Sequence, residues 1–484
     1  MEGKKYIILL LCILLIFSNI ATYHFTSNYF FNAAENLGGY VGPGEESKDS
    51  VDGVPEDLTL FMKVFYRLQE RYIERVPVDQ LVQGAIEGMI DALGDPQTVF
   101  LNKDELENLF IQTSGSFSGI GIEVSMVDDL VTIIAPIKGS PGDKIGLAPG
   151  DQIISVDGKN IEGISLIEAV NKLRGPEGTQ VNIEVKREGL KDLLEFEVTR
   201  KNIVLETVNH EKLEDEFGYI QITNFDERTG LDFRESLEQL ENQNIKGLVI
   251  DLRDNPGGLL QGAVEVGEAI VPAGPITFMV DGQGEVEKTY SSYADPRPYP
   301  ITVLVNSNSA SASEIIAGAL QDSGAGVLVG EPTFGKATVQ HIEEFFDEEF
   351  GLRYTVAKYL TPSKNDISEE GLQPDIEQDL PEIFQYHRYY LSDNLYPGDY
   401  GDDVLYLQKF LQFLGYSEET EGIFDEKTKA NLKDFQEKRG LKPDGKFEEN
   451  TARELRERVG ELLPEHDTQL QEAIKYLEKH NQQN

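Results

Sequence analysis

The sequence predicts a multidomain α/β protein. Its 484 residues correspond to about three domains at roughly 150 residues each. Between residues 201 and 380, strands rich in β-branched residues alternate with helices, a pattern typical of an α/β core. The segments before residue 113 and after residue 396 have helical periodicity instead. The hydrophobic fraction of 39% is enough for packed cores and excludes disorder throughout.

The N-terminus predicts export. Lys4 and Lys5 precede an uncharged apolar run at residues 6–21, and Thr22–Phe25 extend it towards the length of a membrane span. We expect an uncleaved signal anchor at residues 1–25, with a cleaved signal peptide as the alternative. The protein would then be a single-pass protein of the cell membrane whose remaining chain lies outside the cytoplasm.

Changes of pattern divide the rest of the chain. Glycine, proline and acidic residues at 26–55 indicate a flexible linker. The expected segments that follow are a helical region at 56–113, a β-rich domain at 114–200, the α/β core at 201–382, a small helical domain at 396–458 and a last amphipathic helix at 464–484.

Composition excludes several kinds of function. The 86 acidic residues outnumber the 43 basic ones, and a formal net charge of −43 disfavours nucleic acid as a partner. The one cysteine, Cys12, excludes an internal disulfide framework and a thiolate metal cluster. The six histidines are scattered, so a histidine zinc site is not expected.

Three separated segments carry candidate chemistry. After the strand-like GLVIDL, the turn Asn255–Gly258 has two glycines that let backbone amides point outward, as an oxyanion hole requires. After ITVLVN, a small-residue junction sets Ser311 at the start of a helix, where the helix dipole favours negative charge. An ordinary turn and a helix cap completed by Glu314 explain the same residues without catalysis.

The third segment contains Lys336 and Gln340. A lysine activates a serine if burial lowers its pKa, and the Gln340 amide is able to orient it. A lysine facing solvent is the structural alternative. His341 is adjacent, but nothing ties it to a serine, so a Ser-His-Asp triad has little support.

Together, DLR-x-NPGG, SASASE with AGALQD, and GK-x-TVQ resemble the carboxyl-terminal processing proteases of family S41 in order and spacing. The resemblance implies a crotonase/Clp-protease-like α/β serine peptidase core with a PDZ domain inserted before it. Ala337 departs from the family, which often has glycine there; alanine is tolerable unless its φ is positive. The resemblance implies Ser311 as nucleophile, Lys336 as general base, Gln340 as its positioning residue, Gly257, Gly258 and Ala312 as oxyanion-hole amides, and Asp322 as a supporting residue.

The β-rich domain resembles a PDZ domain. Ser118–Ile122 matches the carboxylate-binding loop, so amides around Gly119, Ile120 and Gly121 would bind a substrate C-terminus while the peptide adds as a strand. For Arg174, a sensor role implied by some relatives and a plain surface arginine stay equally open.

Residues 396–458 resemble a peptidoglycan-binding domain, in which EGIFDEKT and DGKFEENT repeat one turn-and-helix element. The last helix resembles the closing helix of relatives that dimerise. We therefore expect an exported serine endopeptidase that recognises substrate C-termini, needs no cofactor or metal, and has protein substrates, peptidoglycan, the membrane and a second copy of itself as partners. The alternatives are a wall-bound PDZ scaffold with an inactive peptidase fold and a cell-wall hydrolase, for which no metal-ligand set or carboxylate pair is found.

Overall fold

The computed structural model describes residues 56–127, 130–187, 189–213, 216–345, 349–387, 394–416 and 420–481. Within these ranges, no helix is both long enough and apolar enough to cross a membrane. The anchor expected at residues 1–25 and the linker at 26–55 lie outside the described residues.

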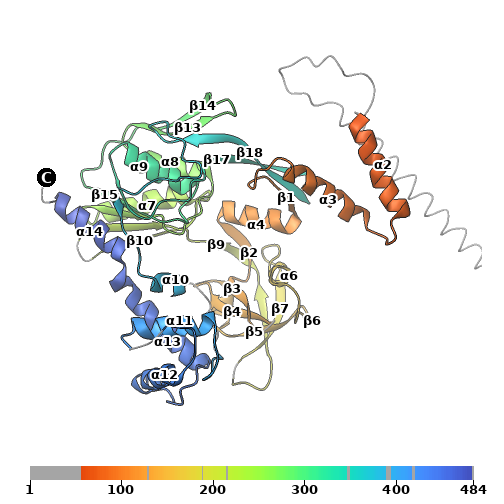
Figure 1. Cartoon of the computed structure of the whole chain (residues 1–484), viewed down its shortest axis with the longest axis vertical. Helices are drawn as coiled ribbons and strands as arrows, with labels where there is room; N and C mark the ends of the chain where they lie inside the picture. The colour runs from red at the N-terminus through yellow and green to blue at the C-terminus, as the bar shows by residue number, and fades with distance from the viewer. Residues whose placement is uncertain are drawn as a thin grey trace, which may run out of the picture. The chain divides into compact units, whose positions relative to one another are not determined.

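The first helices form a unit of their own, which ends at Gly94 (Figure 1). Helix α2 (Glu56–Arg71) is followed by Pro77, which precedes the first residue of α3 (Val78–Asp91). α3 has no buried residue, and apolar side chains of both helices, among them Phe61, Val64 and Met89, are exposed. Each helix therefore presents apolar side chains that the described residues do not cover.

A strand interrupts the helical region expected at 56–113. β1 (Val99–Asn102) pairs with β18 (Phe350–Leu360), some 250 residues further along the chain. Its local sequence continues into α4 (Lys103–Ser114), which begins with a capping box between Asn102 and Glu105. Local periodicity does not reveal so distant a strand partner.

The β-rich domain is a sheet ordered β3-β4-β5-β7-β8, with β6 paired to β5. Along β7, buried residues alternate with more exposed ones, and Val181, Ile183 and Val185 point into the core. β2 (Ser116–Gly119) and β9 (Lys201–Val204) pair as a separate two-stranded antiparallel sheet. The remaining elements are β3 (Ile122–Val127), β4 (Leu130–Pro136), α5 (Pro141–Lys144), β5 (Gln152–Val156), β6 (Lys159–Asn160), α6 (Leu166–Leu173), β7 (Gln180–Lys186) and β8 (Leu194–Thr199).

The α/β fold class that the sequence predicts is confirmed, and its core strands and helices run from β10 to β19. Its main sheet is ordered β10-β11-β12-β15-β16-β19, and all pairs except β10-β11 are parallel. The strands are β10 (Val208–Lys212), β11 (Gly218–Ile222), β12 (Leu248–Asp251), β15 (Ile301–Val305), β16 (Val327–Gly330) and β19 (Ile376–Glu377); the helices are α7 (Thr229–Glu241), α8 (Leu260–Ile270) and α9 (Ala312–Asp322). β12 and β15 are buried along their whole length, because helices cover both faces of the sheet.

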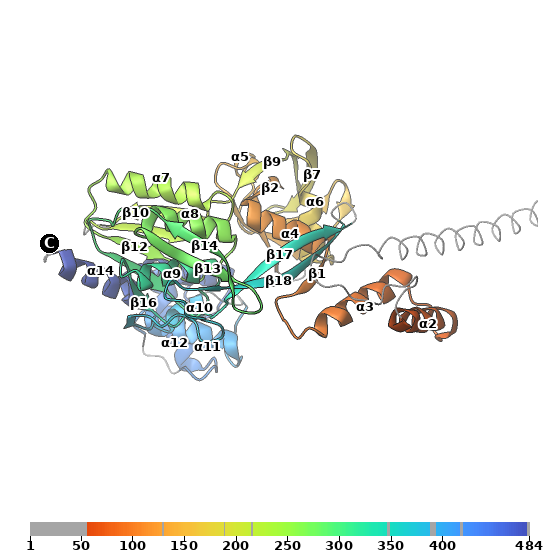
Figure 2. The same cartoon turned by 90° about the horizontal axis from the view of Figure 1, so that it is seen from above.

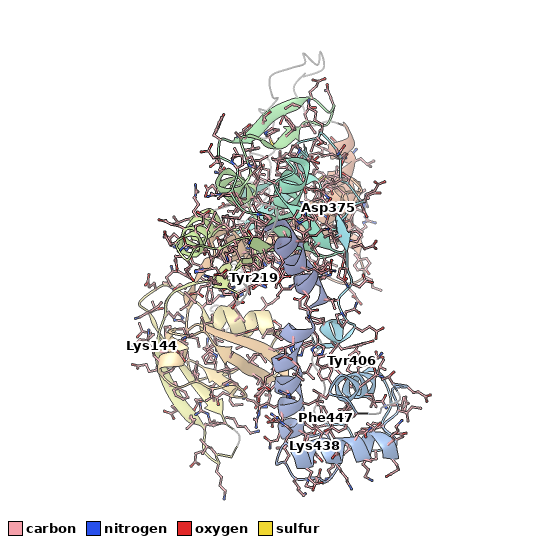
Figure 3. All side chains as sticks on the ribbon, turned by 90° about the vertical axis from the view of Figure 1, so that its left-hand side faces the viewer. Lys144, Tyr219, Asp375, Tyr406, Lys438 and Phe447 are labelled. Atoms are coloured by element: carbon pink, nitrogen blue, oxygen red, sulfur yellow. The ribbon has the colours of Figure 1, made fainter. Side chains whose placement is uncertain are left out.

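Alternate residues of the central strands pack against different helices. Leu248 and Ile250 join the cluster formed with α7, α8 and α9, whereas Val249 belongs to a second cluster that includes Leu477 of α14 (Thr468–Asn481). Figure 3 shows α14 beside Tyr219 of β11. The apolar face of α14 is therefore buried against the sheet of its own chain. In the described structure this face is not exposed for contact with a second copy.

A smaller sheet carries the lysine segment. β18 is its central strand and pairs with β1, β13 (Gly274–Val280) and β17 (Thr338–Phe345), and β14 (Val286–Ser292) pairs with β13 (Figure 2). Lys336 therefore lies two residues before the first residue of β17.

The C-terminal domain contains the predicted repeat as a duplicated hydrogen-bond pattern. Gln408 donates to Ile423 O and Thr428 Oγ1 and accepts from the Gly422 amide. Gln436 makes the equivalent bonds to Lys446 O and Thr451 Oγ1 and accepts from the Gly445 amide. The elements are α10 (Ile383–His387), α11 (Asp402–Phe413), α12 (Glu426–Lys438), α13 (Glu449–Leu462) and the 3₁₀ turn Leu463–His466.

Candidate active site

Ser311 sits at a strained turn between β15 and α9. Its φ of 55° and ψ of −114° are unusual for a residue with a side chain. The turn is held at its backbone, because the Ser311 amide donates to Glu314 Oε2 at 2.8 Å and its carbonyl accepts from the Ile315 amide at 3.0 Å. Ser311 is half-buried, whereas α9 is buried from Ala312 to Leu320.

The glycine turn lies directly against this serine. β12 and β15 are adjacent parallel strands, so the loops at their carboxyl ends meet at one edge of the sheet. A Cβ atom added to Gly257 would lie 2.8 Å from Ser311 Cβ and 3.0 Å from the Ala312 amide nitrogen. One added to Gly258 would lie 2.1 Å from Phe225 O. Their φ values of 104° and 135° and this close approach both require glycine.

The three expected oxyanion-hole amides are not equivalent. The Gly257 amide donates to Asn255 Oδ1 at 2.9 Å. For the amides of Gly258 and Ala312, no acceptor is found in the part of the chain that the structure describes. The two amides left for an external oxygen are therefore those of Gly258 and Ala312.

Other serines of the same segment have structural partners. Ser309 Oγ donates to Leu252 O at 2.8 Å, and Ser313 Oγ donates to Asn255 O at 2.9 Å. Both side chains are fully buried, and Ser307 is exposed. Ser311 is the serine of this segment whose Cβ faces the glycine turn.

Lys336 lies in a partly buried position on the loop between β16 and β17. Burial lowers the pKa of its amine, and the charge of Arg353 lowers it further, while Glu314 and Asp95 act in the opposite direction. Within the described ranges, Lys336 forms no ion pair. The amine of Lys336 therefore loses its proton at a lower pH than the amine of an exposed lysine does. Ala337 is not among the residues with positive φ, so alanine is compatible with its position.

Glu314 connects the serine turn to the lysine loop. Its buried carboxylate accepts from Thr333 Oγ1 at 2.6 Å and from the amides of Gly335, Lys336 and Ser311 at 2.7, 3.0 and 2.8 Å. Burial raises the pKa of Glu314 above its usual value, although these four hydrogen bonds act in the opposite direction. The sequence suggested Glu314 only as part of a helix cap, since its partners on the loop are about 20 residues away.

Tyr359 of β18 bridges the same two segments. Its hydroxyl lies 3.1 Å from Ser311 O and also contacts Lys336 O. The side chain is buried, which raises the pKa of the phenol well above its usual value. No local sequence signal identified Tyr359, because its role depends on the pairing of β17 with β18.

Two predicted site residues have other contacts. Asp322 is at the exposed end of α9, about 16 Å along the helix from Ser311, and accepts from the Ser363 amide at 2.7 Å. Its contact supports the turn after β18 and does not reach the serine–lysine region. Gln340 Nε2 donates to the Gln97 carbonyl at 2.9 Å, a partner the sequence did not suggest.

The glycine turn also has an anchor at the C-terminus. Arg253, two residues before Asn255, pairs with Asp251 at 2.6 Å and bidentately with Asp467 at 2.9 Å. Asp467 immediately precedes α14. The last helix is therefore fixed to the loop that carries Gly257 and Gly258.

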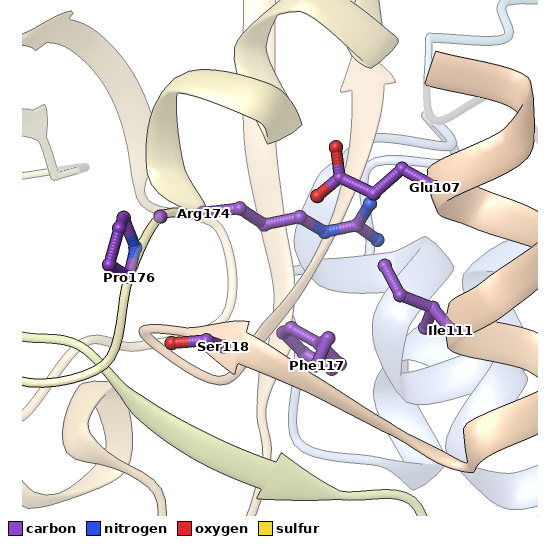
Figure 4. Close-up of a pocket in the computed structure, with 7 residues that line it drawn as sticks. Glu107, Ile111, Phe117, Ser118, Arg174 and Pro176 are labelled. Carbon is purple, nitrogen blue, oxygen red and sulfur yellow. The ribbon is translucent and has the colours of Figure 1, made fainter. Parts of the chain in front are cut away.

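A groove of about 350 Å³ lies between β3 and α6 in the β-rich domain. It is lined by Phe117, Gly119, Ile120, Gly121, Ile122, Glu123, Val124, Ile137, Val170, Leu173 and Arg174. Arg174 also lines a second cavity, of about 300 Å³, with Glu107, Phe117 and Ser118 (Figure 4). Its guanidinium donates to Asn108 Oδ1 at 2.8 Å and lies 5.4 Å from the Phe117 ring centre.

Two buried polar atoms have no hydrogen-bond partner among the described residues: Nε of Arg174, which lines both cavities, and Oγ of Ser118, which lines the second. A buried donor without a partner is costly, and an arriving carboxylate would satisfy it. Burial lowers the pKa of Arg174 and the nearby Glu107 raises it. The contacts favour an arginine held between the groove and α4 over a plain surface arginine.

Comparisons with known proteins find four family models along the chain. They are peptidase family S41 at residues 216–378, a PDZ domain at 132–187, a peptidoglycan binding domain at 400–455 and the activating protease CtpB N-terminal domain at 15–105.

Full-length relatives agree with these models. Carboxy-terminal processing protease CtpA of Bacillus subtilis (strain 168) is 35% identical over 440 residues, which cover 90% of this chain and 93% of that protein. The CtpB protease of the same organism is 36% identical over 422 residues, or 86% and 88% of the two chains. Among solved structures, the photosystem II D1 C-terminal processing protease is 29% identical with a TM-score of 0.41, over 69% of this chain and 96% of that one.

The role of Glu314 as a connector is testable. Glu314→Gln puts an amide NH₂ among groups that are all donors, so we expect the free energy of unfolding to fall by about 2–4 kcal/mol. Activity should fall as well, because the Ser311 and Lys336 backbones lose a shared acceptor. Chemical denaturation and a cleavage assay measure both. The matched control Glu238→Gln, on the exposed side of α7, should change stability by less than about 0.5 kcal/mol. Wild-type stability and activity in Glu314→Gln would contradict the assignment.

Proposed function

Because this chain belongs to the carboxy-terminal processing proteases of peptidase family S41, we propose that Ser311 is its nucleophile and Lys336 the general base that activates it. The observation that supports this pair most strongly is the joint tethering of the two residues. Glu314 and Tyr359 each contact the backbone of both. Shared anchors of this kind keep a nucleophile and its base in a fixed relation.

The proposed reaction is acyl transfer. The neutral amine of Lys336 takes the proton of Ser311 Oγ as the oxygen attacks a substrate carbonyl carbon. The amides of Gly258 and Ala312 stabilise the negative charge on the carbonyl oxygen. The Lys336 ammonium then gives its proton to the leaving amine as the peptide bond breaks. Lys336 then takes a proton from a water molecule that attacks the ester carbon of the acyl-enzyme, and it returns this proton to Ser311 Oγ as the ester bond breaks and the new carboxyl end leaves.

Substrates are proposed to be proteins whose free C-termini enter the PDZ groove. The Ile120 and Gly121 amides have no acceptor among the described hydrogen bonds, and Arg174, whose Nε is unpartnered there, lines the same groove. The peptide would pair with β3 opposite α6. Arg174, which lines the groove, is the cation proposed to bind this carboxylate.

The surroundings of the protease are also part of the proposal. The apolar start of the chain supports an extracytoplasmic protein anchored in the membrane, and the peptidoglycan binding domain supports attachment to the cell wall. The exposed apolar faces of α2 and α3 support a homodimer through these helices. Co-sedimentation with purified cell wall and sedimentation velocity of a soluble fragment are the measurements that decide these two associations.

The catalytic pair is tested by substitution. A soluble fragment carrying Ser311→Ala or Lys336→Ala should cleave an unfolded protein at least 1,000-fold more slowly, since neither residue works alone. Ser307→Ala, an exposed serine of the same segment, is the matched control and should keep full activity.

The pH dependence of cleavage tests Lys336 as the base. Since burial and Arg353 lower the pKa of Lys336, wild-type activity should rise from neutral pH. It should reach its plateau at a lower pH than the one at which an exposed lysine loses its proton.

Three outcomes would contradict the pair. Equal cleavage by Ser311→Ala and wild type removes Ser311 as nucleophile. A flat pH profile between neutral and alkaline pH removes Lys336 as base. A folded wild-type chain that binds peptides and cleaves none favours the scaffold alternative.

Recognition of C-termini is tested with paired peptides. A labelled peptide with a free carboxylate should bind at least about tenfold more tightly than the same peptide with a C-terminal amide, because charge-assisted hydrogen bonds are lost in the amide. Fluorescence anisotropy on the Ser311→Ala chain measures both without cleavage. Arg174→Gln should reduce this preference. Equal affinities for the two peptides would overturn carboxylate recognition in the groove.

A further inference from the structure

The loop Asp95–Thr98 lies against β17 and β18, the two strands that follow the lysine segment. Asp95 Oδ2 accepts from Thr98 Oγ1 and from Thr355 Oγ1, both at 2.7 Å, and Asp95 Oδ1 accepts from the Gln97 amide at 2.9 Å. Thr355 belongs to β18. These three donors fix the Asp95 carboxylate and keep its pKa below the usual value, with Thr98 as the largest cause, so it is ionised at neutral pH.

The same loop fixes the side chain of Gln340. Gln97 O accepts from Gln340 Nε2 at 2.9 Å, and Gln340 pairs with Thr355 across β17 and β18. An amide that donates from Nε2 to a fixed carbonyl cannot exchange its nitrogen and oxygen positions without losing that bond. Its Oε1 then remains the atom that accepts a hydrogen bond from another group.

Charged groups from three elements act on the Lys336 amine. Arg353 of β18 contributes a positive charge, and its Nε is a buried atom without a hydrogen-bond partner among the described residues. Glu314 of α9 and Asp95 of the loop contribute negative charges. The two carboxylates differ in their contacts. Glu314 accepts from three backbone amides and one hydroxyl. Asp95 accepts from two hydroxyls, those of Thr98 and Thr355, and from one amide of its own loop.

We infer that the Asp95–Thr98 loop is a positioning element of the serine–lysine pair. The Gln97 carbonyl orients Gln340 so that Oε1 accepts an N–H of neutral Lys336 and directs the lysine lone pair at Ser311, and Asp95 holds the loop in place and faces the lysine with a negative charge. The inference rests on the proposed function, because it requires Lys336 to be the base.

The charge of Asp95 opposes that of Arg353. Removing the Asp95 carboxylate lowers the pKa of Lys336, and removing the Arg353 charge raises it, since these are the directions in which the two groups act. A loop that served stability alone would leave the ionisation of Lys336 unchanged. The acid limb of the pH profile is the range in which kcat/KM rises as Lys336 loses its proton. The pH of this limb therefore distinguishes a positioning role of the loop from a purely structural one.

The experiment measures kcat, KM and the pH dependence of kcat/KM on a peptide substrate for the soluble chain and its variants. Asp95→Asn should move the acid limb to lower pH and reduce kcat about tenfold, with little change in KM, because the loop is less firmly held. Arg353→Gln should move the limb to higher pH. Thr355→Val removes a hydrogen bond to Asp95 without changing a charge, so it should lower kcat and leave the limb in place. Thr355→Ser should restore kcat.

Two further variants control for general effects. Asp425→Asn changes a hydrogen-bonded turn carboxylate in the C-terminal domain and should leave the profile unchanged. Asp95→Glu is used if Asp95→Asn does not fold. It keeps the negative charge, so it should lower kcat while the acid limb stays at the pH of the wild type.

Failures of the two proposals have different signatures. If Ser311→Ala is inactive but the acid limbs of Asp95→Asn and Arg353→Gln coincide with that of the wild type, the loop inference is overturned and the catalytic pair stands. If Ser311→Ala remains active, the proposed function itself fails. Opposite shifts in Asp95→Asn and Arg353→Gln, with none in Thr355→Val, support the inference.

Discussion

Four hydrogen bonds converge on the buried carboxylate of Glu314, and both parts of the site depend on them. Two of the donors, the amides of Gly335 and Lys336, come from the lysine loop, and a third is the amide of Ser311. A buried carboxylate is costly unless its oxygens are fully satisfied, so departure of either segment leaves an unpaired charge. The cost of burying this group therefore ties Ser311, at a strained φ, to a loop about 25 residues further along the chain.

Parallel strands provide the second constraint. β12 and β15 are neighbours, and their carboxyl ends bring the glycine turn and the serine turn together. Space is so short there that Gly257 and Gly258 accept no side chain. Arg253 extends this edge to Asp467, at the start of the helix that covers the opposite face of the sheet. The chain between residues 382 and 467 thus leaves the core for the C-terminal domain and returns to complete it.

The sequence was sufficient for the fold class, because β-branched strands and amphipathic helices alternate with clear periods through the core. It proposed Ser311, Lys336 and the paired glycines only through their resemblance to the S41 motifs, because a turn, a helix cap and an exposed lysine explain the same residues locally. It did not reveal Tyr359, Asp95 or Asp467. Each of these contacts the site from a distant part of the chain, through strand pairing or helix docking, and has no local motif. Glu314 was visible, but the same residue pattern satisfies an ordinary helix cap.

The net charge of −43 constrains how a negatively charged C-terminus is recognised by this chain. Salt screens exposed charges beyond about 8 Å under physiological conditions, so repulsion by the whole chain weakens the encounter more than the bound state. Close to the groove, Glu107 and Glu123 add negative charge, and Arg174 is the cation that lines both cavities. Recognition must therefore come from donors at hydrogen-bond distance rather than from long-range attraction. Among the described residues, the unpartnered Nε of Arg174 is a donor of that kind, and its burial strengthens a bond that it forms.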